Sequence, residues 1–221
     1  MRLNELEIMD PGETKSKLRS RGGEIDLKQL SIVLKQIEHE CSQIISFYKQ
    51  QAYGDSFNYF IRGSKRHQNT VVYKGQSHVN RYPVDMADHH HNVVVNTMKK
   101  AGFKAHRGNS IFASGRPRTW FGPPYIIFPV NGFHYSFSSK ISDFYSKMSF
   151  NPKFYIALEH FTKKNDIEGM KNFYFKDLEY KIDKGLDEAL DTRVEIMFSG
   201  QYYAIHAERI SQITSWIKDL K

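Results

Sequence analysis

The sequence has a single cysteine, Cys41, among its 221 residues. One thiol excludes an internal disulfide and a zinc site built from several cysteines. No apolar run approaches the ~18 residues that a membrane-spanning helix needs. The N-terminal stretch MRLNELEIMD carries acidic residues among its apolar ones, which is unlike a secretory signal peptide. We therefore expect a cytoplasmic protein that does not enter a membrane.

The familiar catalytic and nucleotide-binding motifs are also missing. GFKAHRGNS (102–110) has too few glycines for a phosphate-binding loop, and SGRPRTWFG (114–122) fits neither the Walker nor the dinucleotide pattern. There is no G-x-S-x-G motif and no cysteine in a setting that would activate it. If the chain is an enzyme, its site must be recognised from a less common pattern.

A run of three histidines, DHHHN (88–92), raises the question of a metal site. Adjacent side chains on a helix point about 100° apart, so the three rings cannot reach one ion. Asp85 and His89 have the i,i+4 spacing that can chelate, but we favour a solvated helix face. We predict no metal.

Cations outnumber acids, with 32 Lys and Arg against 24 Asp and Glu and a net charge of +8. A basic protein attracts phosphate, on nucleic acid, an anionic surface or a dinucleotide. The same charge spread evenly would serve solubility alone, and no block of five or six consecutive cations exists. Cations and aromatic residues do alternate in four segments, a mixture that suits phosphate contacts and base stacking: RGSKRH (62–67), HVNRY (78–82), FKAHRG (103–108) and GRPRTWF (115–121).

The organisation predicted from the pattern is a basic arm or linker (1–23) followed by a single α+β domain (24–221). Within the domain we expect a helical flank (24–53), a β-rich core (57–207) and a closing helix (208–220). Apolar residues at three- and four-residue spacing predict one long helix over 25–48 with Asp26 as its N-cap. A second helix is predicted to open at Pro83, with Asp85 as N-cap, and to end at Gly102.

Short β-rich runs separated by glycine, proline and asparagine fill much of the rest. Strands are expected in SFNYFIRG, TVVY, NSIFASG, PPYIIFPV and GFHYSFS, and RVEIMF-SG-QYYAIHA reads as a β-hairpin. Residues 141–180 are open between helix and strand, with helix favoured for KFYIALEHFTKK, and LDEALD forms a helical turn. Helices followed by a strand-rich half indicate α+β rather than alternating βαβ units.

Three strand-like segments carry polar residues that stand out. Arg62 and Gly63 end YFIRG, Ser114 lies at the end of SIFASG, and Glu195 lies in RVEIMF. Alternation in the last segment turns Glu195 away from the side of Val194. Taken alone, Glu195 is better explained as the exposed face of an edge strand than as a catalytic carboxylate.

Taken in order, the segments IRG, IFASG and EIMFSGQYYAI resemble the arginine–serine–glutamate class of mono-ADP-ribosyltransferases. In that family an Arg-Gly pair ends the first core strand, and an F-x-S-T/G strand follows a helical stretch. A late E-[VI]-[LM]-[IF] strand then turns and returns. The resemblance is one of motif order over residues ~57 to 207. The stretches R-[YF]-P-x-D…H and G-x-x-Y-x-I-F-P also look like those of bacteriophage proteins, which implies the host cytoplasm or a virion as location.

The resemblance implies a mixed or antiparallel β core, NAD as substrate and the catalytic residues Glu195, Ser114 and Arg62. Arginine with its paired donors would hold the pyrophosphate, and Gly63 would let backbone approach it. The Glu195 carboxylate would bond the ribose 2′-hydroxyl and stabilise the oxocarbenium-like charge that forms as the nicotinamide bond breaks. Ser114 would orient Glu195 or the ribose.

Aromatic residues near the second strand, namely Trp120, Phe121 and Tyr125, are candidates for stacking on the nicotinamide, with core packing expected for at least two of them. The sequence departs from the family in two places. Arg193 stands two residues before Glu195, where arginine-modifying members carry Glu or Gln. This departure disfavours an arginine acceptor and suits a phosphate-bearing or acidic one, such as nucleic acid; it also fits a degenerate, non-catalytic relative. Gly115 stands where Thr or Ser is commoner.

The alternative function is that of a non-catalytic basic protein that binds nucleic acid or belongs to a virion, with a degenerate fold of the same kind. Acceptors of either class, protein or nucleic acid, and direct nucleic-acid binding through the four cationic–aromatic segments remain open at this point.

Overall fold

The computed structural model describes residues 18–19, 27–51, 58–65, 67, 70–83, 86–116 and 122–220. Eight α-helices are found in this part of the chain: α1 (Leu27–Glu40), α2 (Ser42–Gln51), α3 (Asp88–Ala101), α4 (Phe144–Phe150), α5 (Pro152–Lys164), α6 (Ile167–Asn172), α7 (Leu186–Asp191) and α8 (Ile210–Asp219). The strands are β1 (Leu18–Arg19), β2 (Ile61–Gly63), β3 (Thr70–Gln76), β4 (Ile111–Ala113), β5 (Pro124–Pro129), β6 (His134–Ser138), β7 (Tyr180–Ile182), β8 (Ile196–Ser199) and β9 (Gln201–His206).

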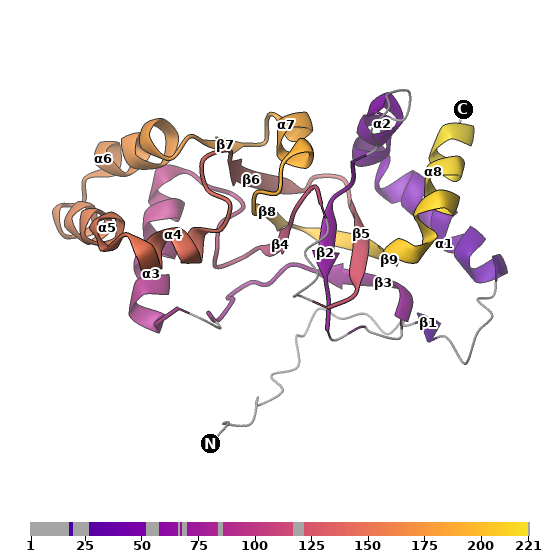
Figure 1. The fold of residues 1–221 in the computed structure, drawn as a ribbon, viewed down its shortest axis with the longest axis horizontal. Helices are drawn as coiled ribbons and strands as arrows, with labels where there is room; N and C mark the ends of the chain where they lie inside the picture. Colours follow the sequence, from indigo (N-terminus) through magenta and orange to yellow (C-terminus); the bar gives the residue numbers. More distant parts are fainter. Residues whose placement is uncertain are drawn as a thin grey trace, which may run out of the picture.

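The strands form two antiparallel sheets, which confirms the α+β class. One sheet has the order β1-β3-β9-β5-β2 and the other the order β4-β8-β6-β7. Figure 1 shows the sheets in the middle of the molecule, with α3–α6 at one end and α1, α2 and α8 at the other. Two residues of the predicted basic arm, Leu18 and Arg19, pair with β3 as the edge strand β1.

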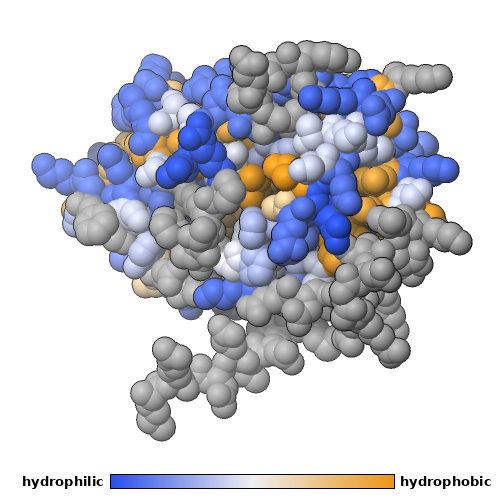
Figure 2. All heavy atoms as spheres, turned by 45° about the vertical axis from the view of Figure 1, so that its right-hand side comes forward, coloured by the Kyte–Doolittle hydropathy of each residue, from blue (hydrophilic) through white to orange (hydrophobic). Residues whose placement is uncertain are grey.

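The two faces of the four-stranded sheet belong to two hydrophobic cores. Ile196 and Phe198 of β8 enter the core that lies between the sheets and beneath α1, α2 and α8. Met197, pointing to the opposite face, enters the core formed with α3–α6. Alternate side chains of a strand point to opposite faces, so β8 is buried on both sides and forms a wall between the two cores. Figure 2 shows hydrophobic atoms near the middle of one face, with areas of hydrophilic side chains on either side.

The N-terminal helical flank has the predicted position but is divided at Cys41. The backbone bonds Cys41 N–H to Ile37 O (2.8 Å) and Ile45 N–H to Cys41 O (3.0 Å) continue across the division. Cys41 is fully buried, and its Sγ lies 3.5 Å from the carbonyl oxygen of Phe128 in β5. Packing of the cysteine, as predicted, places the junction of α1 and α2 against the sheet. Asp26, the predicted N-cap of the first helix, lies outside the described residues.

The predicted start of the second helix needs correction. α3 begins at Asp88, later than the predicted start at Pro83, and Ala87 occupies the N-cap position; Asp85 lies outside the described residues. Its predicted end is confirmed, because Gly102 adopts a left-handed conformation with φ of 99°. Residues 141–180 form α4, α5 and α6, a π-helical turn (Phe173–Asp177) and the start of β7, and the helix favoured for KFYIALEHFTKK is α5.

The predicted hairpin of residues 193–207 is wrong. β8 pairs with β4 and β6, whereas β9 pairs with β3 and β5, so the two strands lie in different sheets. Gly200, with φ of 132°, forms a corner at which the chain crosses from one sheet to the other. This corner is held by Ser77, whose N–H donates to Gly200 O and whose Oγ accepts from Gly200 N–H, both at 2.9 Å. A short turn between two apolar runs therefore has the same sequence pattern in a corner as in a hairpin.

No helix among the described residues is both long and apolar enough to cross a lipid bilayer.

Candidate functional site at the junction of the two sheets

The pairing of three segments brings Arg62, Ser114 and Glu195 together. Ile61 of β2 pairs with Ser114 just beyond β4, with backbone bonds of 2.8 and 2.9 Å in the two directions. Ala113 of β4 in turn pairs with Ile196 of β8. Arg62 directly follows the paired residue Ile61, and Glu195 directly precedes the paired residue Ile196. The backbone bridge between the sheets thus fixes the three residues on neighbouring segments.

These residues line one cleft of about 230 Å³ at this junction. Its walls include Arg62, Gly63, Ser114 and Glu195 from the predicted set. The other polar residues that line it are His78, Arg81, Arg107, Ser110, Asp143 and Tyr145. Three arginines against two carboxylates give the cleft a cationic character, and cationic clefts attract phosphate.

Arg62 is held against β9 by a tyrosine. Its Nη1 donates to the hydroxyl of Tyr202 at 2.7 Å, and its guanidinium carbon lies 5.9 Å from the centre of the Tyr202 ring. The two residues are half-buried and buried, respectively. A guanidinium has five N–H donors in a planar fork, and the bond to Tyr202 orients this fork. Arg62 is therefore a fixed cation at the edge of the cleft.

Ser114 is buried, and its hydroxyl donates to the carbonyl oxygen of Arg116 at 2.5 Å. A hydroxyl has one hydrogen to donate and further lone pairs to accept with. In this conformation Ser114 closes its own turn and can only accept a bond from a ligand. The following Gly115 is enforced by packing, because a β-carbon there would be 1.7 Å from the carbonyl oxygen of Leu190 in α7. This contact accounts for the glycine at position 115.

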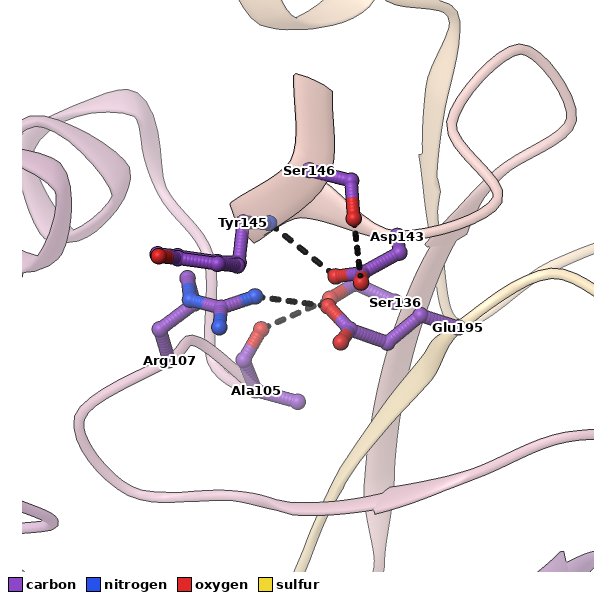
Figure 3. Close-up of polar contacts among 7 residues, drawn as sticks. All are labelled: Ala105, Arg107, Ser136, Asp143, Tyr145, Ser146 and Glu195. Atoms are coloured by element: carbon purple, nitrogen blue, oxygen red, sulfur yellow. Dashed lines mark hydrogen bonds and ion pairs between the residues drawn. The ribbon is translucent and has the colours of Figure 1, made fainter. Parts of the chain in front are cut away.

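Glu195 forms an ion pair with Arg107, at 2.7 Å between Oε1 and Nη1 (Figure 3). The side chains are only 12% and 8% exposed, respectively. Glu195 lies immediately before β8 rather than inside it, and its backbone N–H donates to Ser142 O at 3.0 Å. Burial near this pair also raises the pKa of the Tyr180 hydroxyl well above its ordinary value, and the negative charge of Glu195 adds to the effect.

Asp143 is the second carboxylate of the cleft and caps a helix. Its oxygens accept from the backbone N–H of Tyr145 (3.0 Å) and the hydroxyl of Ser146 (2.8 Å) at the start of α4 (Figure 3). Because these donors are local, Asp143 is best explained as an N-cap that also adds negative charge to the wall next to Glu195.

Two other predicted residues, Tyr125 and Arg193, do not line the cleft. Tyr125 is fully buried in the core, and its hydroxyl contacts the carbonyl oxygens of His67 and Thr70, the latter at 2.6 Å. It therefore packs between the strands and does not line the cleft. Arg193 is exposed and does not line it either. Phe121 and Trp120 lie outside the described residues.

The histidine run is not the fully solvated helix face that we favoured: His89 and His90 are exposed, but His91 is turned into the protein. His89 lies 3.0 Å from Glu159, His90 lies against Tyr155 with ring centres 3.8 Å apart, and His91 is buried. Among the described residues no group of three or more histidine, cysteine or acidic side chains is arranged to hold a metal ion.

Sequence reasoning missed Arg107, which contacts Glu195 directly. Arg107 and Arg81 belong to two of the four cationic–aromatic segments, and both guanidinium groups lie against the ring of Phe112, at 4.9 and 4.2 Å. The alternation of cations and aromatics was therefore a signal for the cleft, although it did not single out either residue.

Comparison with protein-family models, with curated proteins and with solved structures gave no match.

Proposed function

We propose that the chain is an NAD-dependent ADP-ribosyltransferase with an ADP-ribosyltransferase-like fold. The observation that supports this most is the register that joins Arg62, Ser114 and Glu195 at one cleft. The family resemblance requires an arginine, a serine and a glutamate from three strand segments to meet, and three unrelated surface residues would have no reason to do so.

The proposed reaction breaks the bond between ribose C1′ and the nicotinamide nitrogen of NAD. The bonding electron pair leaves with the nitrogen, which gives neutral nicotinamide and positive, oxocarbenium-like charge on the ribose. The Glu195 carboxylate accepts a hydrogen bond from the ribose 2′-hydroxyl and stabilises that charge electrostatically. A nucleophilic atom of the acceptor then bonds to C1′ and loses its proton.

Arg62 would supply the contact with the pyrophosphate. A guanidinium held at the edge of a cleft binds phosphate oxygens in paired geometry, and Gly63 beside it lines the same cleft. The Ser114 hydroxyl, whose hydrogen is directed to Arg116, would accept a bond from a ribose hydroxyl. A cleft of about 230 Å³ accommodates the nicotinamide–ribose end, and the rest of the dinucleotide would lie along its rim.

Arg193 bears on the acceptor. It is exposed, two residues before Glu195 and outside the cleft lining. A cation there repels an arginine acceptor and attracts a phosphate-bearing or acidic one. We therefore propose an anionic macromolecular acceptor, either nucleic acid or an acidic protein segment.

The proposal is tested by measuring nicotinamide release from NAD by the purified chain, by Glu195→Gln and by Arg62→Lys. Glu195→Gln should lower kcat by about 100-fold or more, as expected for loss of an electrostatic contact to the transition state. Arg62→Lys should mainly raise the KM for NAD. Lys140→Gln, which breaks an ion pair outside the cleft, is the control. If the wild-type chain neither binds NAD nor releases nicotinamide with nucleic-acid or protein acceptors, catalysis must be abandoned.

A second candidate, nucleic-acid binding without catalysis, is favoured by the fact that Arg62, Arg81 and Arg107, from three of the cationic–aromatic segments, line the same cleft. An electrophoretic shift assay over a salt series distinguishes it. Phosphate-driven affinity must fall steeply as salt rises, so affinity that is absent or independent of salt removes this candidate. The two candidates coincide if nucleic acid is the acceptor.

A further inference from the structure

We infer that Arg107 is the positioning residue for Glu195, a task that the family resemblance assigned to Ser114. The inference rests on the proposed function, because it names the group that sets the catalytic carboxylate. Arg107 acts through Glu195 and is not itself expected to touch the reacting bond.

The Arg107 guanidinium is held on several sides. Its Nη1 lies 2.7 Å from Glu195 Oε1, and its central carbon lies 4.9 Å from the Phe112 ring centre and 5.3 Å from that of Phe144. Its Nε is buried and has no hydrogen-bond partner in the described part of the chain. Buried donors are normally paired, and the Nε donor of Arg107 is an exception. The orientation of the guanidinium is therefore determined by the ion pair with Glu195 and by the two aromatic rings.

The segment that carries Arg107 is itself anchored on both sides. The Ser136 hydroxyl donates to Ala105 O at 2.7 Å (Figure 3), and Arg81 N–H donates to Gly108 O at 2.7 Å. A β-carbon at Gly108 would be 2.9 Å from a methyl carbon of Val95, so the turn packs closely on α3. These contacts make Arg107 a fixed point from which Glu195 can be placed.

Ser114 cannot do the same work in this conformation. Its one hydroxyl hydrogen is directed to Arg116 O, 2.5 Å away, and none remains to donate to the Glu195 carboxylate. Glu195 is instead fixed at its backbone by Ser142 O and at its side chain by Arg107. An arginine also favours the ionised carboxylate, which is the form that the proposed reaction needs.

The charge around Glu195 sets its protonation. The titratable and charged groups that share its surroundings are the guanidinium groups of Arg107, Arg81 and Arg62, the imidazole of His78, the carboxylate of Asp143, and the hydroxyl groups of Tyr145 and Tyr180. Arg107 and Asp143 carry opposite charges, so they act on the ionisation of Glu195 in opposite directions. Removing the arginine leaves Asp143 to disfavour a second negative charge, and Glu195 should then protonate at higher pH.

The experiment compares the wild-type chain with Arg107→Gln, Arg107→Lys, Ser114→Ala and the control Lys140→Gln in nicotinamide release across pH. We expect Arg107→Gln to lower kcat about 100-fold, the effect of a misplaced catalytic group, with little change in KM. Its acid limb should move up by about one pH unit. Arg107→Lys should recover part of kcat, and Ser114→Ala should lose less than Arg107→Gln.

A purely structural role would lower the amount of active protein without moving the acid limb. That outcome, or a rise in KM at unchanged kcat, overturns the inference, the latter because it would make Arg107 a substrate-binding residue. A second measurement does not depend on activity: the carboxyl ¹³C titration of Glu195, assigned by its loss in Glu195→Gln. A titration midpoint that rises in Arg107→Gln supports the inference, and an unchanged midpoint contradicts it, even if the wild-type chain fails to cleave NAD and the proposed function falls.

Discussion

Replacing Gly115 with serine should disrupt the bridge between the two sheets. The new β-carbon would start 1.7 Å from Leu190 O, whereas ordinary contact begins at 3.4 Å, so backbone must move by about 1.7 Å. Overpacking of this kind costs about 1–3 kcal/mol. The movement also strains the two backbone bonds between Ser114 and Ile61, each contributing about 0.5–1.5 kcal/mol. We expect Gly115→Ser to lower the free energy of unfolding by about 2–6 kcal/mol, a large part of the ~5–15 kcal/mol that holds a domain folded.

Urea unfolding followed by circular dichroism measures this loss. The matched control is Gly132→Ala, because Gly132 has a positive φ of 85° but nothing within 4 Å of an added β-carbon. It should lose only about 1 kcal/mol, through backbone strain. If Gly115→Ser loses as little as Gly132→Ala, the packing against Leu190 does not determine this position, and the structural reason given for glycine is wrong.

Three further predictions concern buried groups. Arg107→Leu removes the cation that pairs with the buried Glu195 carboxylate and should lower the free energy of unfolding in urea by about 3–5 kcal/mol. The control Lys140→Gln breaks a pair whose side chains are 50% and 49% exposed and should lower it by less than about 1 kcal/mol. Equal losses in the two variants would contradict the burial argument. Burial lowers the pKa of His106 to about 4, so the unfolded chain takes up its proton first, and stability should fall by about 3 kcal/mol as pH drops from about 6.5 to about 4. His106→Gln should show a smaller fall, and an identical fall would exclude His106 as its source. Burial raises the pKa of the Cys41 thiol to about 12, so alkylation by iodoacetamide should proceed only at the rate of unfolding, and fast alkylation of the native chain would contradict its placement in the core.

The local elements were largely predictable from the sequence, and the pairing between them was not. Periodicity and turn residues marked α5, α8 and most strands, because these signals act within a few residues of one another. The relation of β8 to β9 depended on partners far away in the chain, namely β4 and β6 for one strand and β3 and β5 for the other. A tight turn at Gly200 is compatible with a hairpin and with a corner between sheets, and only tertiary packing decides between them.

The site shows the same division. Motif order selected Arg62, Ser114 and Glu195, and these residues do line one cleft. Arg107 was missed because an arginine in a polar turn has no local feature that distinguishes it from a surface cation, while its partner is 88 residues away. Tyr125 was placed at the ligand because it is aromatic and close to the second strand in sequence. Its position in β5 turns the ring into the core, where its hydroxyl bonds the carbonyl of Thr70.

The central claim is that Arg62, Ser114 and Glu195 form one NAD-binding cleft. The most direct measurement is a crystal structure of Glu195→Gln soaked or grown with NAD, a variant that should bind the dinucleotide without cleaving it. The account predicts the nicotinamide ribose in the cleft, its 2′-hydroxyl within hydrogen-bonding distance of residue 195, and the pyrophosphate at Arg62. NAD bound elsewhere, or an empty cleft at saturating NAD, would contradict it.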